Sequence, residues 1–379
     1  MSSLKYGFID SIRGIAILMV ILVHTSQSLT LPEGWLQLVS SYGQMGVQLF
    51  FVASAYTLCL TFEKRGREDN ALANFYIRRF FRIAPIYYLG ILCYFLLRTF
   101  EGYLKVGQVA IPEQYTAVNV LANFAFINGL YEPANNNIVP GGWSIGTEML
   151  FYLVFPFFMA LTSKFLTRKI WAISLPFIVV VSSISIWELA GYSVTNNDFL
   201  YFSILNQSSV FAVGISLYFI HTYHAHLISH VGLAKLVMLT IGLSILSLYV
   251  GWIRYVEQAF ILVPFLAAAS FLFLVEIFKR INSNKLQLLQ KIGQRSYSMY
   301  IMHFVFAHQV SGVINKKLFI EHIGSELSLV VCYLMTVIAT YYLAGISSRY
   351  VESYFIGIGK AVINNIPKRS DQPDAKNRV

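Results

Sequence analysis

Long apolar runs recur along the whole chain, and short polar segments separate them. A helix needs roughly 20 mostly apolar residues to cross the hydrocarbon core of a bilayer. Ten runs approach this length, at residues 8–29, 44–62, 83–100, 147–163, 170–190, 200–220, 232–250, 258–278, 296–314 and 327–346. The pattern predicts an all-α fold: a polytopic transmembrane helix bundle of about ten spans.

An eleventh apolar stretch, residues 117–130, is shorter, and Asn119, Asn123 and Asn128 interrupt it. If this stretch does not cross the membrane, both termini and 23 of the 28 Lys and Arg residues fall on one side. Because cytoplasmic loops are enriched in Lys and Arg, we expect that side to be cytoplasmic. The stretch is then interfacial or re-entrant on the outer side, within the long loop 101–146.

The sequence indicates a single membrane domain. We expect it to cover residues 1–349, with residues 350–379 forming an amphipathic, then polar, cytoplasmic tail. Five basic residues remain on the outer side in this arrangement: Arg98, Lys105, Arg254, Lys316 and Lys317.

Composition excludes a soluble domain. The 379 residues are 56% apolar and only 12% charged, with a mean hydropathy of +0.61. Soluble domains carry about a quarter charged residues, so too little polar surface would cover a soluble fold. The net charge of +10 does not indicate nucleic-acid binding, because the basic residues lie in short clusters between apolar runs, as loops beside an anionic leaflet would. Three cysteines inside apolar runs form neither a disulfide framework nor a metal pattern.

The first span carries ionisable residues, which are costly in a membrane and are therefore functional candidates. Asp10, Arg13 and His24 interrupt an otherwise apolar helix. Helical geometry puts Arg13 and His24 within about 20° of each other and roughly 16 Å apart along the axis. An arginine that snorkels and a hydrogen-bonded interior histidine would be the structural alternative. That alternative explains Arg13 well but explains a histidine deep in the span poorly.

Three arginines, Arg78, Arg79 and Arg82, precede Pro85 at the cytoplasmic end of the third span. Arg78 and Arg82 are one helical turn apart and can face the same anion, and guanidinium groups bind phosphate bidentately. A positive-inside anchor has the same appearance, and spacing alone does not separate the two interpretations.

Two further polar sets lie in later spans. Trp143, Ser144 and Glu148 stand near the expected outer end of the fourth span, where a carboxylate cap and an interfacial Trp anchor are the plainer interpretations. Tyr300 and His303 share a face of the ninth span, and structural hydrogen bonding is favoured for them.

Four histidines, His221, His224, His226 and His230, cluster near the cytoplasmic end of the sixth span. No acidic residue or cysteine joins them, so a solvated loop is favoured over a zinc site, and we expect no bound metal. Glu276 lies near a span end and is expected to be interfacial.

Taken together, these motifs resemble the acyltransferase family 3 membrane proteins over nearly the whole chain, from Tyr6 to about Tyr354. The resemblance rests on Ile9-Asp-Ser-Ile-Arg-Gly-Ile-Ala with His24, Gly46-Val-Gln-Leu-Phe-Phe-Val-Ala-Ser-Ala-Tyr56, the arginine cluster ending Arg82-Ile-Ala-Pro85, Trp143-Ser-Ile-Gly-Thr-Glu148 and Ser296-Tyr-Ser-Met-Tyr-Ile-Met-His303. One departure concerns Tyr354, where relatives often place a proline two residues after the glutamate at Glu352. We expect this departure to affect the exit of the last helix more than catalysis.

The resemblance implies transfer of an acyl group, usually acetyl from acetyl-CoA as a donor co-substrate rather than a bound cofactor, to a hydroxyl of a cell-surface or lipid-linked glycan. His24 would then be the general base, Glu148 would orient His24 or hold the acceptor, and Arg13 would balance Asp10 or stabilise charge on the donor. Arg78, Arg79 and Arg82 would hold the CoA phosphates, while Trp143, Ser144, Tyr300 and His303 would support the site.

The expected location is the bacterial cytoplasmic (inner) membrane, among lipids and with no nucleic-acid partner. A proton-coupled transporter or flippase, or a glycan polymerase, would be the competing class. Intramembrane charges also suit transport, but the inverted repeat often found in secondary transporters is missing.

Overall fold

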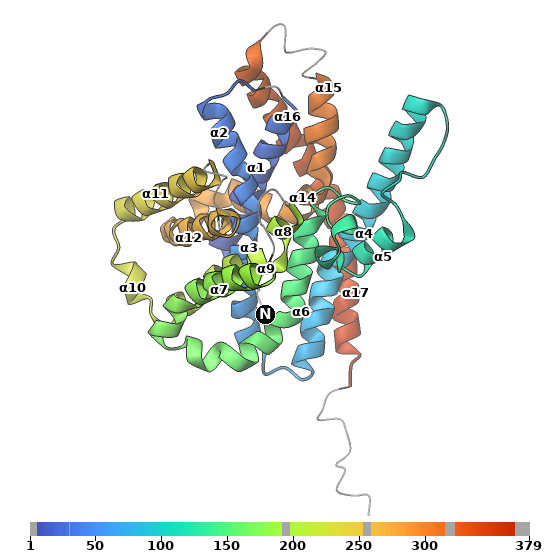
Figure 1. The fold of residues 1–379 in the computed structure, drawn as a ribbon. Helices are drawn as coiled ribbons and strands as arrows, with labels where there is room; N and C mark the ends of the chain where they lie inside the picture. The colour runs from blue at the N-terminus through green and yellow to red at the C-terminus, as the bar shows by residue number, and fades with distance from the viewer. Residues whose placement is uncertain (1–5, 30, 192–197, 253–258, 315–322, 368–379) are drawn as a thin grey trace, which may run out of the picture.

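The computed structural model describes residues 6–29, 31–191, 198–252, 259–314 and 323–367, and these residues form helices and loops without a strand. Within them, nine helical segments are long and apolar enough to cross a bilayer. They contain α1 (Gly7–Gln27), α3 (Gly46–Arg65), α4 (Ala71–Val106), α6 (Gly142–Leu166), α7 (Lys169–Leu189), α9 (Ile204–Tyr223), α11 (Leu233–Trp252), α12 (Ala259–Arg280) and α16 (Gly324–Ser347) (Figure 1). The prediction of an all-α membrane bundle is confirmed.

The remaining predicted span, 296–314, is helical from Ser296 to Ile314 but irregular. It consists of α14 (Ser296–Phe304), a π-helical segment Val305–Val310 and α15 (Ser311–Ile314). Single π-helical turns inside α-helices often mark functional sites, because the extra residue per turn re-aims the side chains that follow.

The interior of the bundle is formed by α1, α3 and α9. The span containing α9 is the most buried, whereas α11 lies at the periphery and exposes apolar side chains such as Met238 and Ile245. α1 packs closely against the short helix α13 (Gln287–Gln294), because Gly14 and Gly293 leave no side chain between the two backbones. This contact fixes α1 relative to α14, which follows α13 directly.

Residues 117–130 form no helix long enough to cross a bilayer, in agreement with the prediction that they do not span it. They form α5 (Ala117–Phe124) and a 3₁₀ turn, Asn128–Leu130, that pack beside α4 (Figure 1). The asparagines that interrupt the apolar stretch are buried and bind backbone carbonyls: Asn123 donates to Asn119 and Ala134 and accepts from Tyr87 Oη at 2.6 Å. Irregular backbone inside a membrane protein requires such internal partners.

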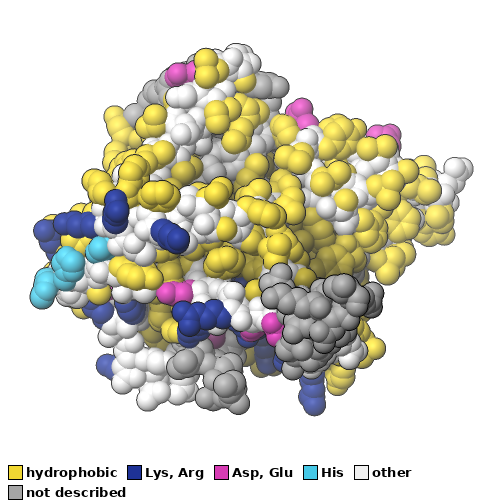
Figure 2. All heavy atoms as spheres, turned by 90° about the horizontal axis from the view of Figure 1, so that it is seen from below, with side chains coloured by type: hydrophobic (Ala, Val, Ile, Leu, Met, Phe, Trp, Pro, Cys, Tyr) yellow, Lys and Arg dark blue, Asp and Glu magenta, His cyan; other side chains and the backbone are white. Residues whose placement is uncertain are grey.

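Both ends of the described chain contact the region where α3 leads into α4. Lys64 Nζ donates to Tyr6 Oη at 2.7 Å, and the Asn70 amide donates to the Pro367 carbonyl at 2.9 Å. Tyr6 and Pro367 therefore lie on one side of the bundle, here called the basic face. Figure 2 views this side from below and shows Lys and Arg side chains spread across it.

The last span does not stop at residue 349. α16 continues through a π-helical segment, Ser348–Glu352, into α17 (Ser353–Asn364), which packs along the first half of α4 (Figure 1). Gly359 lies directly against Phe81. The helix thus runs past Tyr354, where relatives often have a proline. A domain boundary at 349 stays a prediction, and residues 368–379 of the predicted tail lie outside the described residues.

Candidate active site

A cavity of about 1080 Å³ opens on the basic face between the end of α3, the start of α4, α6 and α17. All three arginines of the predicted phosphate site line it, because they occupy the early turns of α4 on neighbouring faces. Two further cations join them: Arg65 from α3 and Lys360 from α17. We call this the basic-face cavity.

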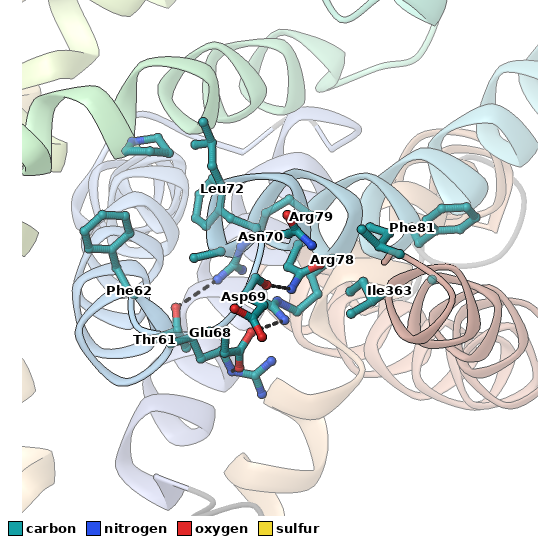
Figure 3. Close-up of a pocket in the computed structure, with 18 of the residues that line it drawn as sticks. Thr61, Phe62, Glu68, Asp69, Asn70, Leu72, Arg78, Arg79, Phe81 and Ile363 are labelled. Atoms are coloured by element: carbon teal, nitrogen blue, oxygen red, sulfur yellow. Dashed lines mark hydrogen bonds and ion pairs between the residues drawn. The ribbon is translucent and has the colours of Figure 1, made fainter. Parts of the chain in front are cut away.

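The arginines differ in their partners. Arg78 is ion-paired with Glu68 at 2.9 Å, and Arg79 donates to Thr61 Oγ1 at 3.3 Å (Figure 3). Arg82 is exposed to the cavity and forms no ion pair or hydrogen bond with any described residue. Its guanidinium group is therefore free of hydrogen-bond partners within the described part of the chain and can bind an incoming anion.

A second, smaller cavity of about 80 Å³ lies deeper in the bundle, and we call it the inner cavity. Arg79 and Arg82 line it as well as the basic-face cavity, together with Arg13 from α1 and Glu148 from α6. Glu148 accepts hydrogen bonds from Ser54 Oγ, at 2.5 Å, and from the Tyr152 hydroxyl. One carboxylate thus stands among three guanidinium groups.

Glu148 differs from its predicted position. The sequence places it at the outer end of a span, near His24. In the structure it instead accepts a hydrogen bond from Ser54 of α3 and lines the inner cavity with arginines of α1 and α4. The cause is the segment before α6, which folds inward so that α6 begins at a buried Gly142.

Asp10 and Trp143 line neither of these two cavities. Asp10 accepts from Gln294 at 3.1 Å and forms no ion pair with Arg13, whose hydrogen bond goes to Thr57 at 3.5 Å. Trp143 is buried and stacks on Phe202, with ring centroids 4.3 Å apart, so it is not an interfacial anchor.

His24 lies in a cluster of rings beyond the inner cavity. The centroid of its imidazole is 5.2 Å from that of His303, 5.6 Å from that of His308 and 4.3 Å from that of Phe304. His24 Nδ1 lies 2.9 Å from Gln27 Oε1. Because an amide oxygen only accepts, Nδ1 carries the proton and Nε2 keeps its lone pair.

Tyr300 connects the inner cavity to this cluster. Its hydroxyl lies 2.8 Å from Ser144 Oγ, both residues line the inner cavity, and the centroid of its ring is 5.5 Å from that of His303. His303 is fully buried and donates from Nδ1 to the Tyr300 carbonyl at 2.6 Å. Its Nε2 has no hydrogen-bond partner among the described residues, so a ring nitrogen with a free lone pair is buried next to His24.

A third cavity, of about 510 Å³, opens on the side opposite the basic face, and we call it the outer cavity. Phe304 and His308 form part of its wall, so the ring cluster borders it directly. The far end of α4 forms another part, with Arg98, Glu101 and Lys105.

Several of these residues are absent from the sequence prediction. His308 follows His303 by five residues, which in a regular α-helix would point it about 140° away. The π-helical segment Val305–Val310 brings the imidazoles of both His303 and His308 to His24. No local sequence pattern predicts that segment. Gln27 could have been found, since it lies three residues after His24 on the same helix.

One interpretation of the sequence is wrong. His221 and Glu276 are expected in a solvated loop and at an interface, yet their side chains are only 2% and 6% exposed and lie 3.0 Å apart. Arg280 completes the network from the next turn, at 2.7 Å from Glu276. Helix packing between α9 and α12 brings these groups together, which spacing along the chain does not reveal.

Comparison with known proteins points to one family. The profile of the family described as an acyltransferase domain (acyltransferase family 3) matches residues 6–345. O-acetyltransferase OatA of Staphylococcus aureus (strain MRSA252) is 27% identical over 395 residues, which cover 96% of this chain and 59% of that protein. Acyltransferase MdmB of Streptomyces mycarofaciens is 26% identical over 141 residues, 35% of this chain and 33% of that protein.

A putative O-acetyltransferase of S. aureus (strain COL) is 25% identical over 385 residues, 94% of this chain and 58% of that protein. The chain spans about three-fifths of the length of the S. aureus relatives. No solved structure matches the chain.

Proposed function

Because the chain belongs to acyltransferase family 3 and its described residues include nine helical segments able to cross a bilayer, we propose that it is a multi-pass membrane acyltransferase. From this premise we propose that it transfers an acyl group, with acetyl the first candidate, from acyl-CoA to a hydroxyl group. The acceptor is a cell-surface or lipid-linked glycan. The proposed setting is the bacterial inner membrane, with the basic face toward the cytoplasm, where acyl-CoA is found.

One observation carries this proposal: a succession of cavities and rings leads from one face of the bundle to the other. Arg79 and Arg82 line both the basic-face cavity and the inner cavity. Tyr300 continues the path to His303 and His24, and His308 opens it to the outer cavity. A charged donor can bind at one end and a polar acceptor at the other.

The donor end suits the phosphates of CoA. Guanidinium groups form bidentate, charge-assisted hydrogen bonds with phosphate oxygens, and five cations line the basic-face cavity. The narrow inner cavity would receive the acyl-bearing arm of CoA between Arg13 and Glu148. In this arrangement Glu148, rather than Asp10, is the carboxylate that lines the inner cavity together with the guanidinium groups.

His24 is the proposed general base. Its Nε2 accepts the proton of the acceptor hydroxyl while the hydroxyl oxygen attacks the thioester carbonyl carbon. The carbon–sulfur bond then breaks, CoA leaves as the thiolate, and the thiolate takes a proton. Gln27 holds the ring in the tautomer that leaves Nε2 free. An acyl-histidine intermediate fits the same geometry, because the same nitrogen is the nucleophile.

The test uses purified protein in lipid nanodiscs with radiolabelled acetyl-CoA and a surface-glycan extract. We expect label in the glycan with wild-type protein and none with His24→Ala. His226→Ala is the matched control, because His226 is exposed on the short helix α10 (His226–Ser229) and lines none of the three cavities, and it should keep full activity. An active, well-folded His24→Ala protein would refute the proposal that His24 is the general base. Movement of glycan across a liposome membrane without acylation would favour the transporter class.

A further inference from the structure

The outer cavity is lined by positively charged side chains that have no role in the proposed reaction. Lys and Arg are depleted on the outer side of membrane proteins, so cations that stay there need an explanation. Arg98 and Lys105 both line this cavity. They are seven residues apart on α4, which places them on one face of the helix about 10 Å apart along its axis.

These two cations are available to a ligand. Neither forms an ion pair or hydrogen bond with a described residue, although Glu101 lies between them on the same face of α4. The Arg98 side chain is half-buried in the cavity wall, so it does not extend freely toward lipid headgroups. Its charge also reaches Tyr115: burial raises the pKa of that hydroxyl, and the positive charge of Arg98 reduces the rise.

The position along α4 fits an acceptor site. Arg98 lies sixteen residues after Arg82, or about 24 Å along the helix, which is close to the roughly 30 Å thickness of the hydrocarbon core. α4 therefore bears cations at both membrane boundaries. At the outer boundary, Phe304 and His308 separate the cavity from His24 by a single layer of rings, with centroid distances of 4.3 and 5.6 Å to His24.

We propose that the outer cavity binds an acidic glycan, holding a carboxylate or phosphate of the acceptor between Arg98 and Lys105 so that a neighbouring hydroxyl points toward His24. This inference rests on the proposed function and names the chemical class of its acceptor. A charged anchor fixes the register of the sugar, so that one hydroxyl is presented to the base rather than several. Charge-assisted hydrogen bonds to an oxyanion supply the binding energy.

The experiment measures binding and catalysis separately, in nanodiscs of neutral phosphatidylcholine. The probes are an oligogalacturonate, the same oligosaccharide with its carboxylates reduced to alcohols, and a phosphorylated form of the reduced oligosaccharide. We expect the acidic probes to bind at least about tenfold more tightly than the neutral one, with a preference that weakens as salt is added. The comparison between carboxylate and phosphate identifies which oxyanion the cavity prefers.

Arg98→Gln should reduce the preference for acidic probes about tenfold and leave binding of the neutral probe unchanged. Lys105→Gln, at an exposed position where misfolding is not expected, should act in the same direction. Lys291→Gln is the matched control, because Lys291 is an exposed cation on α13 and lines none of the three cavities. Equal binding of acidic and neutral probes, or a full preference in both variants, would overturn the proposal.

Two outcomes separate this inference from the proposed function. If acidic glycan binds through Arg98 but is never acylated, the proposed acyl transfer is wrong and the proposed anion site stands. If acidic and neutral glycans are acylated with equal kcat/KM, the proposed acyl transfer stands and the proposed anion site is wrong. If phosphatidylglycerol in the nanodisc abolishes the preference, the cavity binds a lipid headgroup and the proposal fails.

Discussion

Replacing Gly293 by alanine tests the contact that holds α1 beside α14. A Cβ at this position would lie 1.7 Å from the carbonyl oxygen of Asp10, whereas real Cβ contacts essentially never fall below 3.0 Å. The two backbones must therefore separate locally by about 1.3 Å, the difference between these two distances. Backbone atoms cannot rotate out of the way as a side-chain end can, so α1 and α13 must shift as bodies.

The cost follows from that displacement. Overpacking of this kind costs about 1–3 kcal/mol or more, while alanine recovers about 1 kcal/mol of helix propensity. We expect a fall of a few degrees in melting temperature, taking roughly 2–4 °C per kcal/mol as for soluble domains of 150–250 residues. Activity should fall further, on the order of a hundredfold, because a shift of about 1 Å in catalytic groups has that effect and this contact sets the distance between His24 and His303.

The assay compares purified variants in one detergent, by thermal melting and by the initial rate of acetyl transfer. Gly242→Ala is the matched control: it lies within α11, and an added Cβ meets nothing within 4 Å. That variant should melt at or slightly above the wild-type temperature and keep its rate. If Gly293→Ala melts no lower than Gly242→Ala and transfers acetyl at the wild-type rate, the backbone contact does not position the site.

Two further predictions concern hydrogen bonds. Gln27→Leu removes the partner of His24 Nδ1, so the favoured tautomer loses about 1 kcal/mol, and kcat should fall about fivefold while KM for acetyl-CoA stays unchanged. Asn123→Ala removes the acceptor of the buried Tyr87 hydroxyl and the side-chain donor to the Ala134 carbonyl, so the free energy of unfolding should fall by about 2–4 kcal/mol, measured by denaturant or thermal melting.

The controls for these two variants are exposed residues of the same type. Gln37→Leu, on α2 (Trp35–Tyr42), should leave kcat unchanged, and Asn284→Ala should leave stability unchanged. A Gln27→Leu enzyme that raises KM for acetyl-CoA instead of lowering kcat would place Gln27 in donor binding. An Asn123→Ala protein as stable as Asn284→Ala would show that the segment 117–130 does not depend on this side chain.

Hydropathy was sufficient to predict nine of the ten expected spans, because lipid imposes its requirement on each helix separately. Every crossing segment must be apolar over its own length, so the pattern is local and can be read residue by residue. The same holds for the arginines of α4, which are close in sequence and therefore line one cavity. The exclusion of residues 117–130 from the spans also needed only the distribution of Lys and Arg.

The chemistry of the site depended on contacts between distant segments, and these only the tertiary structure decided. Whether Glu148 faces His24 or Arg13 depends on how deep the start of α6 lies, which the inward fold of the preceding segment sets. His308 joins His24 because a π-helical segment changes the rotation of one helix, and His221 pairs with Glu276 because two helices pack at one register. Sequence spacing fixes directions within a helix, whereas rotation and depth relative to other helices follow from packing of the whole bundle.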